Sequence, residues 1–275
     1  MAGLSAGLTA LPVYVRHVIS ARVQSARIWV WLLSLLMLGG GRMACAQVTA
    51  GASPGLNAAL VRLFGNVNAF TAQLHIRMTD GQGTETLSAP MKFSLLDGKM
   101  RGDLDVTKLK STELPAFAAS AAKSVGMQNV ITLVRPDRKE TYLLYPAFQA
   151  CVVAPIDEAD VAALKKPAKI QKTPLGRETL DGHRCVKNKV VVTESDGRQH
   201  EATVWNATDL KDFPLRIQTV DGADTIILHF RQVKFERPAA KDFDLPAGTA
   251  KYDDPQALAQ AVMKKLIGEA LGVGK

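Results

Sequence analysis

Five Asp-Gly dipeptides punctuate this chain, and they constrain its fold more than any other feature. They begin at Asp80, Asp97, Asp181, Asp196 and Asp221. An Asp-Gly pair favours a tight β-hairpin, because both central residues of a type I′ turn require positive φ. Most of the five lie between short segments in which apolar and polar residues alternate. The sequence therefore predicts a mainly β protein (α+β) built from antiparallel hairpins.

The first of these segments, residues 70–79, alternates without interruption. Apolar residues that include Phe70, Leu74 and Ile76 are predicted on one face, and polar residues on the other. Strict alternation is typical of a strand with one buried face. Related patterns recur at residues 91–95, 100–106, 130–134, 141–145, 170–177, 183–193, 199–205, 215–220 and 224–235. The chain is therefore predicted to form one curved sheet with an apolar face.

Helices are expected at both ends of the sheet domain. Ser53 and Pro54 are typical of an N-cap and a first helical residue, and Leu60 and Phe64 continue an apolar stripe. Pro255 begins a second helical pattern near the C-terminus. We therefore divide the chain into a leader (1–46), a linker with the N-terminal helix (47–69), the β domain (70–252) and a C-terminal helix (253–275).

The leader has the pattern of a secretory signal peptide. Arginines precede an uncharged run at residues 28–38, and Ala44-Cys45-Ala46 fits a cleavage site. The apolar run is shorter than the roughly 20 residues that span a bilayer, although an uncleaved anchor is the alternative. The sequence therefore predicts a periplasmic or secreted protein after cleavage near Ala46.

Charge and cysteine content agree with export. Residues 1–46 contain four arginines and no acidic residue, so cleavage lowers the formal net charge from +8 to +4. A mildly basic exported domain gives no reason to expect nucleic acid as a partner. Cleavage also leaves Cys151 and Cys185, and an even pair in an oxidising compartment predicts a disulfide. Two unrelated buried thiols are the alternative.

Metalloprotease and nucleotide-binding motifs are absent from the sequence. The chain lacks H-E-x-x-H, P-loop and Rossmann G-x-G-x-x-G patterns, so we expect neither catalysis nor a cofactor. His183 and Cys185 share a strand face, and His200 or His229 would have to join them to hold a metal. Because no tight ligand spacing is present, no metal site is predicted. A metal-dependent hydrolase is the weakest of three functional hypotheses.

A basic stretch follows the middle of the chain. It consists of Lys165, Lys166, Lys169, Lys172, Arg177, Arg184, Lys187 and Lys189. Such a stretch is either an ordinary solvated strand face or a docking surface for an envelope protein or an anionic membrane surface.

The order of several short motifs resembles a known family. Leu143-Leu144-Tyr145-Pro146 is followed by Gly176–Cys185, then by Trp205 and Asp209–Ile217, and finally by Phe243, Leu245–Gly248 and Tyr252. This set resembles the DUF4412-type proteins, which are similar to the LolA/LolB lipoprotein-carrier superfamily, over roughly residues 70–252. The resemblance implies a LolA-like open half-barrel, an antiparallel sheet with helices covering its concave face. In the carriers that hollow holds lipoprotein acyl chains.

Two main hypotheses about function follow. The first is an exported envelope protein that binds a lipid or a lipoprotein acyl chain in the concavity of the sheet. The candidate lining residues are Phe70, Leu74, Ile76, Met91, Phe93 and Leu133. The alternative is a non-enzymatic interaction or structural protein, in which the same residues fill a core and the basic face makes the contacts. An empty apolar cavity favours the first hypothesis, and a packed one favours the second.

Overall fold

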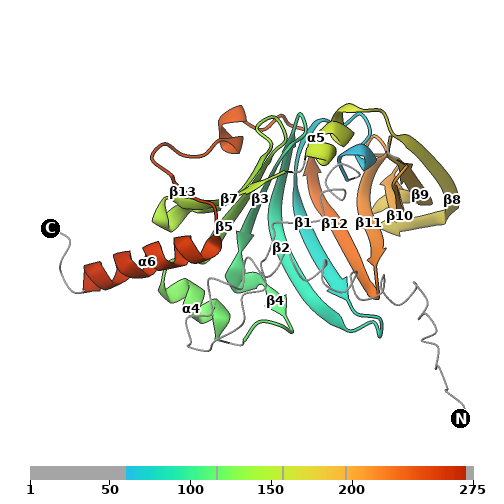
Figure 1. Ribbon diagram of the computed structural model, residues 1–275. Coiled ribbons are helices and arrows are strands. Elements are labelled where there is room, and N and C mark those ends of the chain that lie inside the picture. Colours follow the sequence, from blue (N-terminus) through green and yellow to red (C-terminus); the bar gives the residue numbers. More distant parts are fainter. Residues whose placement is uncertain (1–59, 116, 157, 196, 271–275) are drawn as a thin grey trace, which may run out of the picture.

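The computed structural model describes residues 60–270, apart from residues 116, 157 and 196 (Figure 1). The predicted leader, its cleavage site and the first part of the N-terminal helix lie outside the described residues.

Thirteen strands form one strongly curved sheet (Figure 1). Its order is β13-β7-β6-β5-β3-β2-β1-β12-β11-β10-β9-β8, and the short β4 pairs with β2. Neighbouring strands are antiparallel except β13, which runs parallel to β7. The strands are β1 (Ala69–Thr79), β2 (Glu85–Leu96), β3 (Lys99–Asp105), β4 (Lys110–Ser111), β5 (Asn129–Arg135), β6 (Glu140–Tyr145), β7 (Ala150–Pro155), β8 (Lys169–Leu180), β9 (His183–Thr193), β10 (Gln199–Ala207), β11 (Phe213–Asp221), β12 (Asp224–Lys234) and β13 (Ala250–Tyr252).

Asp80, Asp97 and Asp181 each begin a connection between antiparallel neighbours, as predicted, and Gly222 lies between β11 and β12. Asp97 and Gly98 join β2 to β3 with φ of 49° and 81°, and Asp181 and Gly182 join β8 to β9 with φ of 48° and 86°. Positive φ at both positions is what a type I′ turn requires. The predicted fold class, a mainly β protein with an open antiparallel sheet and few helices, is confirmed.

The sheet is curled around its apolar face. Strands from β9 through β12 to β3 all contribute to a single hydrophobic core cluster, so this face is concave. Five phenylalanine rings form its centre, with centroids between 4.9 and 6.4 Å apart. We call them the aromatic cluster, which consists of Phe64, Phe70, Phe93, Phe213 and Phe230.

A second core cluster covers the other end of the same face. Leu104, Val130 and Val152 of the sheet pack there with Leu258 and Val262 of α6 (Pro255–Ala270). The side chain of Asp254 caps α6 by accepting a hydrogen bond from the backbone N–H of Gln256 at 2.6 Å. The helix therefore starts where the predicted C-terminal helix does.

The remaining helical segments are short. They are residues 60–63, α4 (Ala118–Ser124), α5 (Glu158–Lys165) and the 3₁₀ turns η1 (Val106–Lys108), η2 (Pro146–Phe148) and η3 (Ala240–Phe243). Within the described part of the chain, no helix is both long and apolar enough to cross a membrane.

The predicted disulfide between Cys151 and Cys185 is wrong. Both thiols are free and buried, one on β7 and the other on β9. Eight strands separate β7 from β9 in the sheet, and the two sulfurs belong to different core clusters. The prediction failed because an even number of cysteines carries no information about the lateral order of the strands that bear them.

Candidate functional site

Packed side chains fill the part of the concave face where the sequence predicted a ligand. Phe70, Leu74 and Phe93 are at most 7% exposed and belong to the core cluster around the aromatic rings. Ile76 and Met91 are partly buried and contact both core clusters. The first three side chains therefore form a packed floor, and the other two form the bridge between the clusters.

Leu133 lies on the opposite face of the sheet. It pairs with Arg101 of β3 and Tyr142 of β6, and it packs with Tyr142, Leu144 and Cys151. Residues 130–134 are almost continuously apolar, so alternation did not reveal which of them face the concavity. The structure thus brings five of the six candidate residues to one face and leaves Leu133 behind it.

An open hollow remains on the concave side, beside the aromatic cluster. Its volume is about 200 Å³, and it lies between residues 60–63 and strands β9 to β12. We call it the apolar hollow, because most of its lining is aliphatic: Leu60, Leu63, Val192, Ala202, Ile217, Val220, Ile226 and Leu228. Val220 is 66% exposed, although it is a large apolar residue.

Residues 60–63 form the roof of the apolar hollow, and a buried ion pair holds this roof in place. Arg62 donates to both carboxylate oxygens of Glu194 at 3.1 Å, and the Glu194 side chain is only 2% exposed. Arg62 also donates to the backbone carbonyl of Lys166, at the end of α5, at 2.7 Å. Because a buried pair is costly to break, the roof is fixed to the sheet.

Four polar residues also line the hollow: Gln199, His200, Glu201 and Thr219. His200 pairs with Val192 on the concave side of β10, and its Nε2 atom is buried with no hydrogen-bond partner in the described part of the chain. In the sequence His200 is a candidate only for a metal site, and its place in the hollow was missed. The signal was present, because His200, Ala202 and Val204 alternate on one face and only the first is polar.

The histidines and cysteine considered for a metal do not meet. His183 pairs with Asp209 at 2.8 Å, His229 pairs with Asp181 at 2.7 Å, and Cys185 is in the core. Within the described residues, no group of three or more His, Cys, Asp or Glu side chains is arranged to hold a metal ion.

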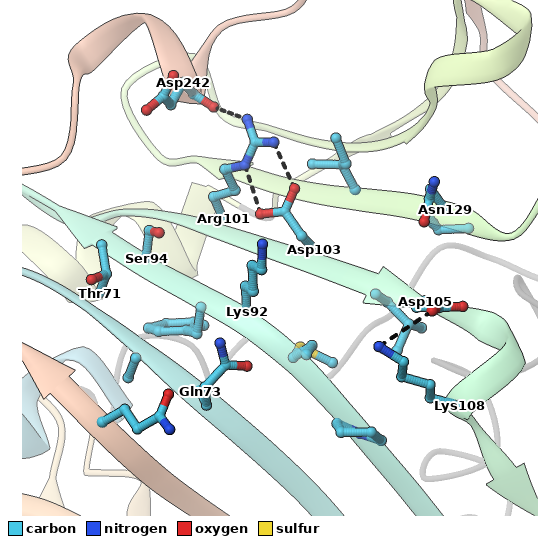
Figure 2. Close-up of a pocket in the computed structure, with 18 of the residues that line it drawn as sticks. Thr71, Gln73, Lys92, Ser94, Arg101, Asp103, Asp105, Lys108, Asn129 and Asp242 are labelled. Atoms are coloured by element: carbon cyan, nitrogen blue, oxygen red, sulfur yellow. Dashed lines mark hydrogen bonds and ion pairs between the residues drawn. The ribbon is translucent and has the colours of Figure 1, made fainter.

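The convex face carries a larger, polar groove (Figure 2). Its volume is about 880 Å³, and its labelled lining includes Gln73, Lys92, Arg101 and Asp103. Arg101 donates to Asp103 at 2.6 and 2.8 Å and to the Asp242 carbonyl at 2.6 Å. Its side chains are mostly polar or charged, so the groove suits water or a polar ligand better than an acyl chain.

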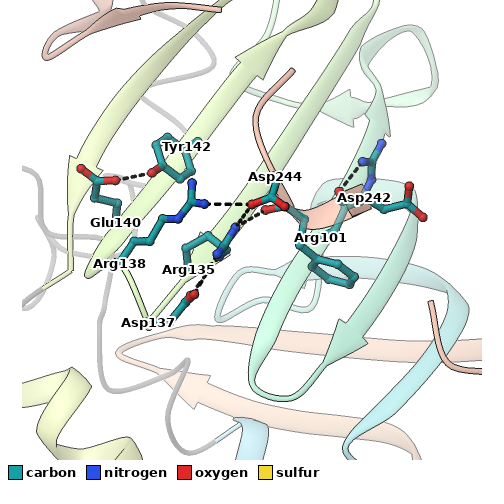
Figure 3. A network of polar contacts seen from close by, with 9 residues as sticks. Arg101, Arg135, Asp137, Arg138, Glu140, Tyr142, Asp242 and Asp244 are labelled. Carbon is teal, nitrogen blue, oxygen red and sulfur yellow. Dashed lines mark hydrogen bonds and ion pairs between the residues drawn. The ribbon is translucent and has the colours of Figure 1, made fainter. Parts of the chain in front are cut away.

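A polar network fastens the chain beyond β12 to the convex face (Figure 3). The guanidinium of Arg135 donates to the Phe243 carbonyl at 2.8 Å, to Asp244 at 2.6 Å, and to Asp137 at 2.7 and 2.9 Å. Arg138 reaches Asp244 from the solvent side at 3.0 Å. Phe243 is fully buried as a result, so this network is structural.

The basic stretch occupies an edge of the sheet. Among the described strands, β8 pairs only with β9, and eleven of its twelve residues are exposed. Lys187 and Lys189 are paired with Glu178 and Glu201. We call the exposed part on β8 the basic edge. It consists of Lys169, Lys172 and Arg177, which form no ion pair with the described residues, together with Ile170 and Leu175, which are 40% and 53% exposed.

Comparison with solved structures finds similar chains of low sequence identity. The Mycobacterium tuberculosis lipoprotein LppX has a TM-score of 0.36 at 16% identity, over 64% of this chain and 94% of its own. A LolA superfamily protein from Nitrosomonas europaea has a TM-score of 0.32 at 12% identity, over 70% and 96%. LprF from Mycobacterium bovis has a TM-score of 0.34 at 14% identity, over 68% and 99%.

These TM-scores all lie below 0.5, a level at which likeness does not establish function. No protein-family model and no curated protein sequence matches this chain.

Proposed function

We propose that this protein is an exported, non-enzymatic envelope protein that binds an apolar ligand, such as the acyl chain of a lipid or lipoprotein, in the apolar hollow. The observation that carries the proposal is the open aliphatic space between the fixed roof and β9 to β12. The leader pattern supports export, and the resemblance of residues 70–252 to DUF4412-type proteins supports a carrier-like role.

The size of the apolar hollow limits what it holds. An engineered apolar cavity of about 150 Å³ is large enough to bind benzene, so about 200 Å³ holds only a short part of an acyl chain. The remainder of a longer chain would leave beside the exposed Val220. Contact with apolar surface is worth roughly 25 cal/mol per Å² removed from water, which makes the aliphatic lining the source of affinity.

The test fills the hollow with one added ring. Ala202 lines it, whereas Thr203, the next residue of β10, points to the other face, where it pairs with Lys189 and Gln218. Ala202→Phe should weaken binding of 11-(dansylamino)undecanoic acid at least tenfold, and the matched control Thr203→Phe should bind like wild type. Thermal melting of each variant shows whether the fold is retained.

Native mass spectrometry of the purified protein provides a second measurement, in which a co-purified lipid is expected in wild type and absent in Ala202→Phe. A wild type that binds neither the probe nor any lipid, or an Ala202→Phe variant that binds normally, would overturn the proposal.

The basic edge favours a second candidate function, contact with an anionic membrane surface. Lys169, Lys172 and Arg177 have no ion-pair partner among the described residues and lie beside exposed Ile170 and Leu175. Such an edge combines electrostatic attraction with apolar insertion, at roughly 1 kcal/mol per Lys or Arg near an anionic surface. The protein should float with vesicles that contain phosphatidylglycerol and not with phosphatidylcholine alone.

Charge-reversal variants show whether membrane binding depends on the basic edge or only on the net charge of the protein. The triple change Lys169→Glu, Lys172→Glu and Arg177→Glu should abolish flotation. The control reverses Lys110, Lys123 and Lys241, which are exposed elsewhere on the molecule, and should leave flotation nearly intact. Equal loss in both triple variants would show that only net charge matters and would end this candidate.

A further inference from the structure

The apolar hollow contains one group that its aliphatic lining does not explain. His200 lines the hollow and pairs with Val192 of β9, and its Nε2 atom is buried without a hydrogen-bond partner among the described residues. A buried polar atom is normally paired with protein, water or ligand, because leaving it unpaired forfeits its hydration. The position of the atom, inside a space proposed for a ligand, points to a partner that enters with that ligand.

The charged groups around the hollow are already satisfied. Glu194 is held by Arg62, and Glu201 projects from β10 toward Lys189, with which it pairs at 2.8 Å. Neither carboxylate is within an ion-pair distance of His200. The imidazole Nε2 is therefore the group available to meet the polar end of a bound molecule.

We infer that His200 binds the carboxylate of a fatty acid whose chain lies along the aliphatic lining of the hollow. The inference rests on the proposed apolar ligand and specifies its class. An imidazole N–H donated to a carboxylate is a charge-assisted hydrogen bond, about twice as strong as a neutral one. The apolar hollow would then distinguish a free fatty acid from an apolar molecule of the same length that lacks the charge.

Two probes of equal chain length test this, octanoic acid and 1-octanol, titrated calorimetrically at neutral pH. Wild type should bind octanoate at least tenfold more tightly than octanol. His200→Phe, which keeps a ring of similar size, should lose that preference while its octanol affinity stays within about twofold. His200→Gln retains a side-chain donor and should recover part of the preference, and it serves as the test if the Phe variant does not fold.

The outcomes separate the two proposals. If octanoate and octanol bind wild type equally, or if the preference survives in both His200 variants, the fatty-acid inference is wrong and the apolar site stands. If neither probe binds wild type, the proposed function fails, and the inference fails with it.

Discussion

At the scale of single residues, Cys151 and Cys185 show how burial controls reactivity. Both side chains are at most 1% exposed. Desolvation by burial disfavours the thiolate and raises the pKa of both thiols above the ordinary value. Since the thiolate is the reactive form, both cysteines should be inert in the folded protein.

This leads to a labelling prediction. In the native protein, iodoacetamide should modify Cys151 and Cys185 slowly, and in urea without reductant it should modify both completely. Peptide mapping by mass spectrometry reads the two positions separately. A disulfide-linked peptide that contains both residues would contradict the strand order described above.

Arg135 holds the chain after β12 on the convex face. Its side chain is 6% exposed, whereas its partners Asp137 and Asp244 are 45% and 46% exposed. Arg135→Met should leave the Phe243 carbonyl unpaired in the core, which costs about 1–3 kcal/mol of unfolding free energy. Arg138→Met removes a surface pair with the same Asp244 and should cost about 0–1 kcal/mol. Urea unfolding at neutral pH measures both.

The same network predicts a pH dependence. Hydrogen bonds from Arg135 hold the pKa of Asp137 and of Asp244 below the ordinary value. A lowered carboxyl pKa contributes stability above the unfolded value of about 3.9, and that contribution is lost as the pH falls through the folded value. The difference in stability between wild type and Arg135→Met should therefore shrink below about pH 4. A difference that is constant from pH 7 to pH 2 would show that these carboxylates contribute nothing.

At the scale of elements, the short helical end at residues 60–63 matters more than its length suggests. Gly65, with φ of 59°, ends it in the left-handed region that favours glycine. This turn directs Phe64 into the aromatic cluster, where its ring lies 4.9 Å from Phe70 and 5.6 Å from Phe213. Together with the pair between Arg62 and Glu194, this contact fixes the roof of the apolar hollow.

Truncation of Phe64 tests that role. Phe64→Ala should lower the free energy of unfolding by about 3–5 kcal/mol, because the side chain is 3% exposed and its removal opens a cavity. Phe117→Ala makes the same chemical change at a side chain that is 62% exposed, so it should be nearly neutral. If urea unfolding shows that both changes lower the free energy of unfolding equally, packing of Phe64 does not hold residues 60–63 on the sheet.

At the scale of the whole molecule, the sheet has a stable centre and an exposed edge. β1 is flanked by β2 and β12, and two core clusters cover its concave face. Within residues 60–270 as described, β8 has a neighbouring strand on one side only, and little of its surface is buried. Local opening requires little free energy where few apolar contacts are broken.

Hydrogen exchange should therefore differ sharply between the two strands. Peptides from residues 169–180 should exchange early, and peptides from residues 69–79 should exchange last, in a time course followed by mass spectrometry. Protection of β8 equal to that of β1 would show that another molecule covers the edge.

The sequence by itself determined the local structure of this protein. Asp-Gly turns and strict alternation are set by backbone φ and by the period of two along a strand, so the hairpins and the apolar face that carries Phe70, Leu74 and Phe93 were predictable. These signals extend over only a few neighbouring residues.

Only the tertiary structure decided what depends on the lateral order and curl of the strands. The order separated Cys151 from Cys185 and placed Leu133 behind the sheet, where a continuous apolar run had hidden its direction. The curl brought Leu60 and Leu63 over β10 to β12, and it left His200 unpaired in the hollow between them. Contacts between residues more than a hundred positions apart create that hollow, and no pattern along the chain encodes them.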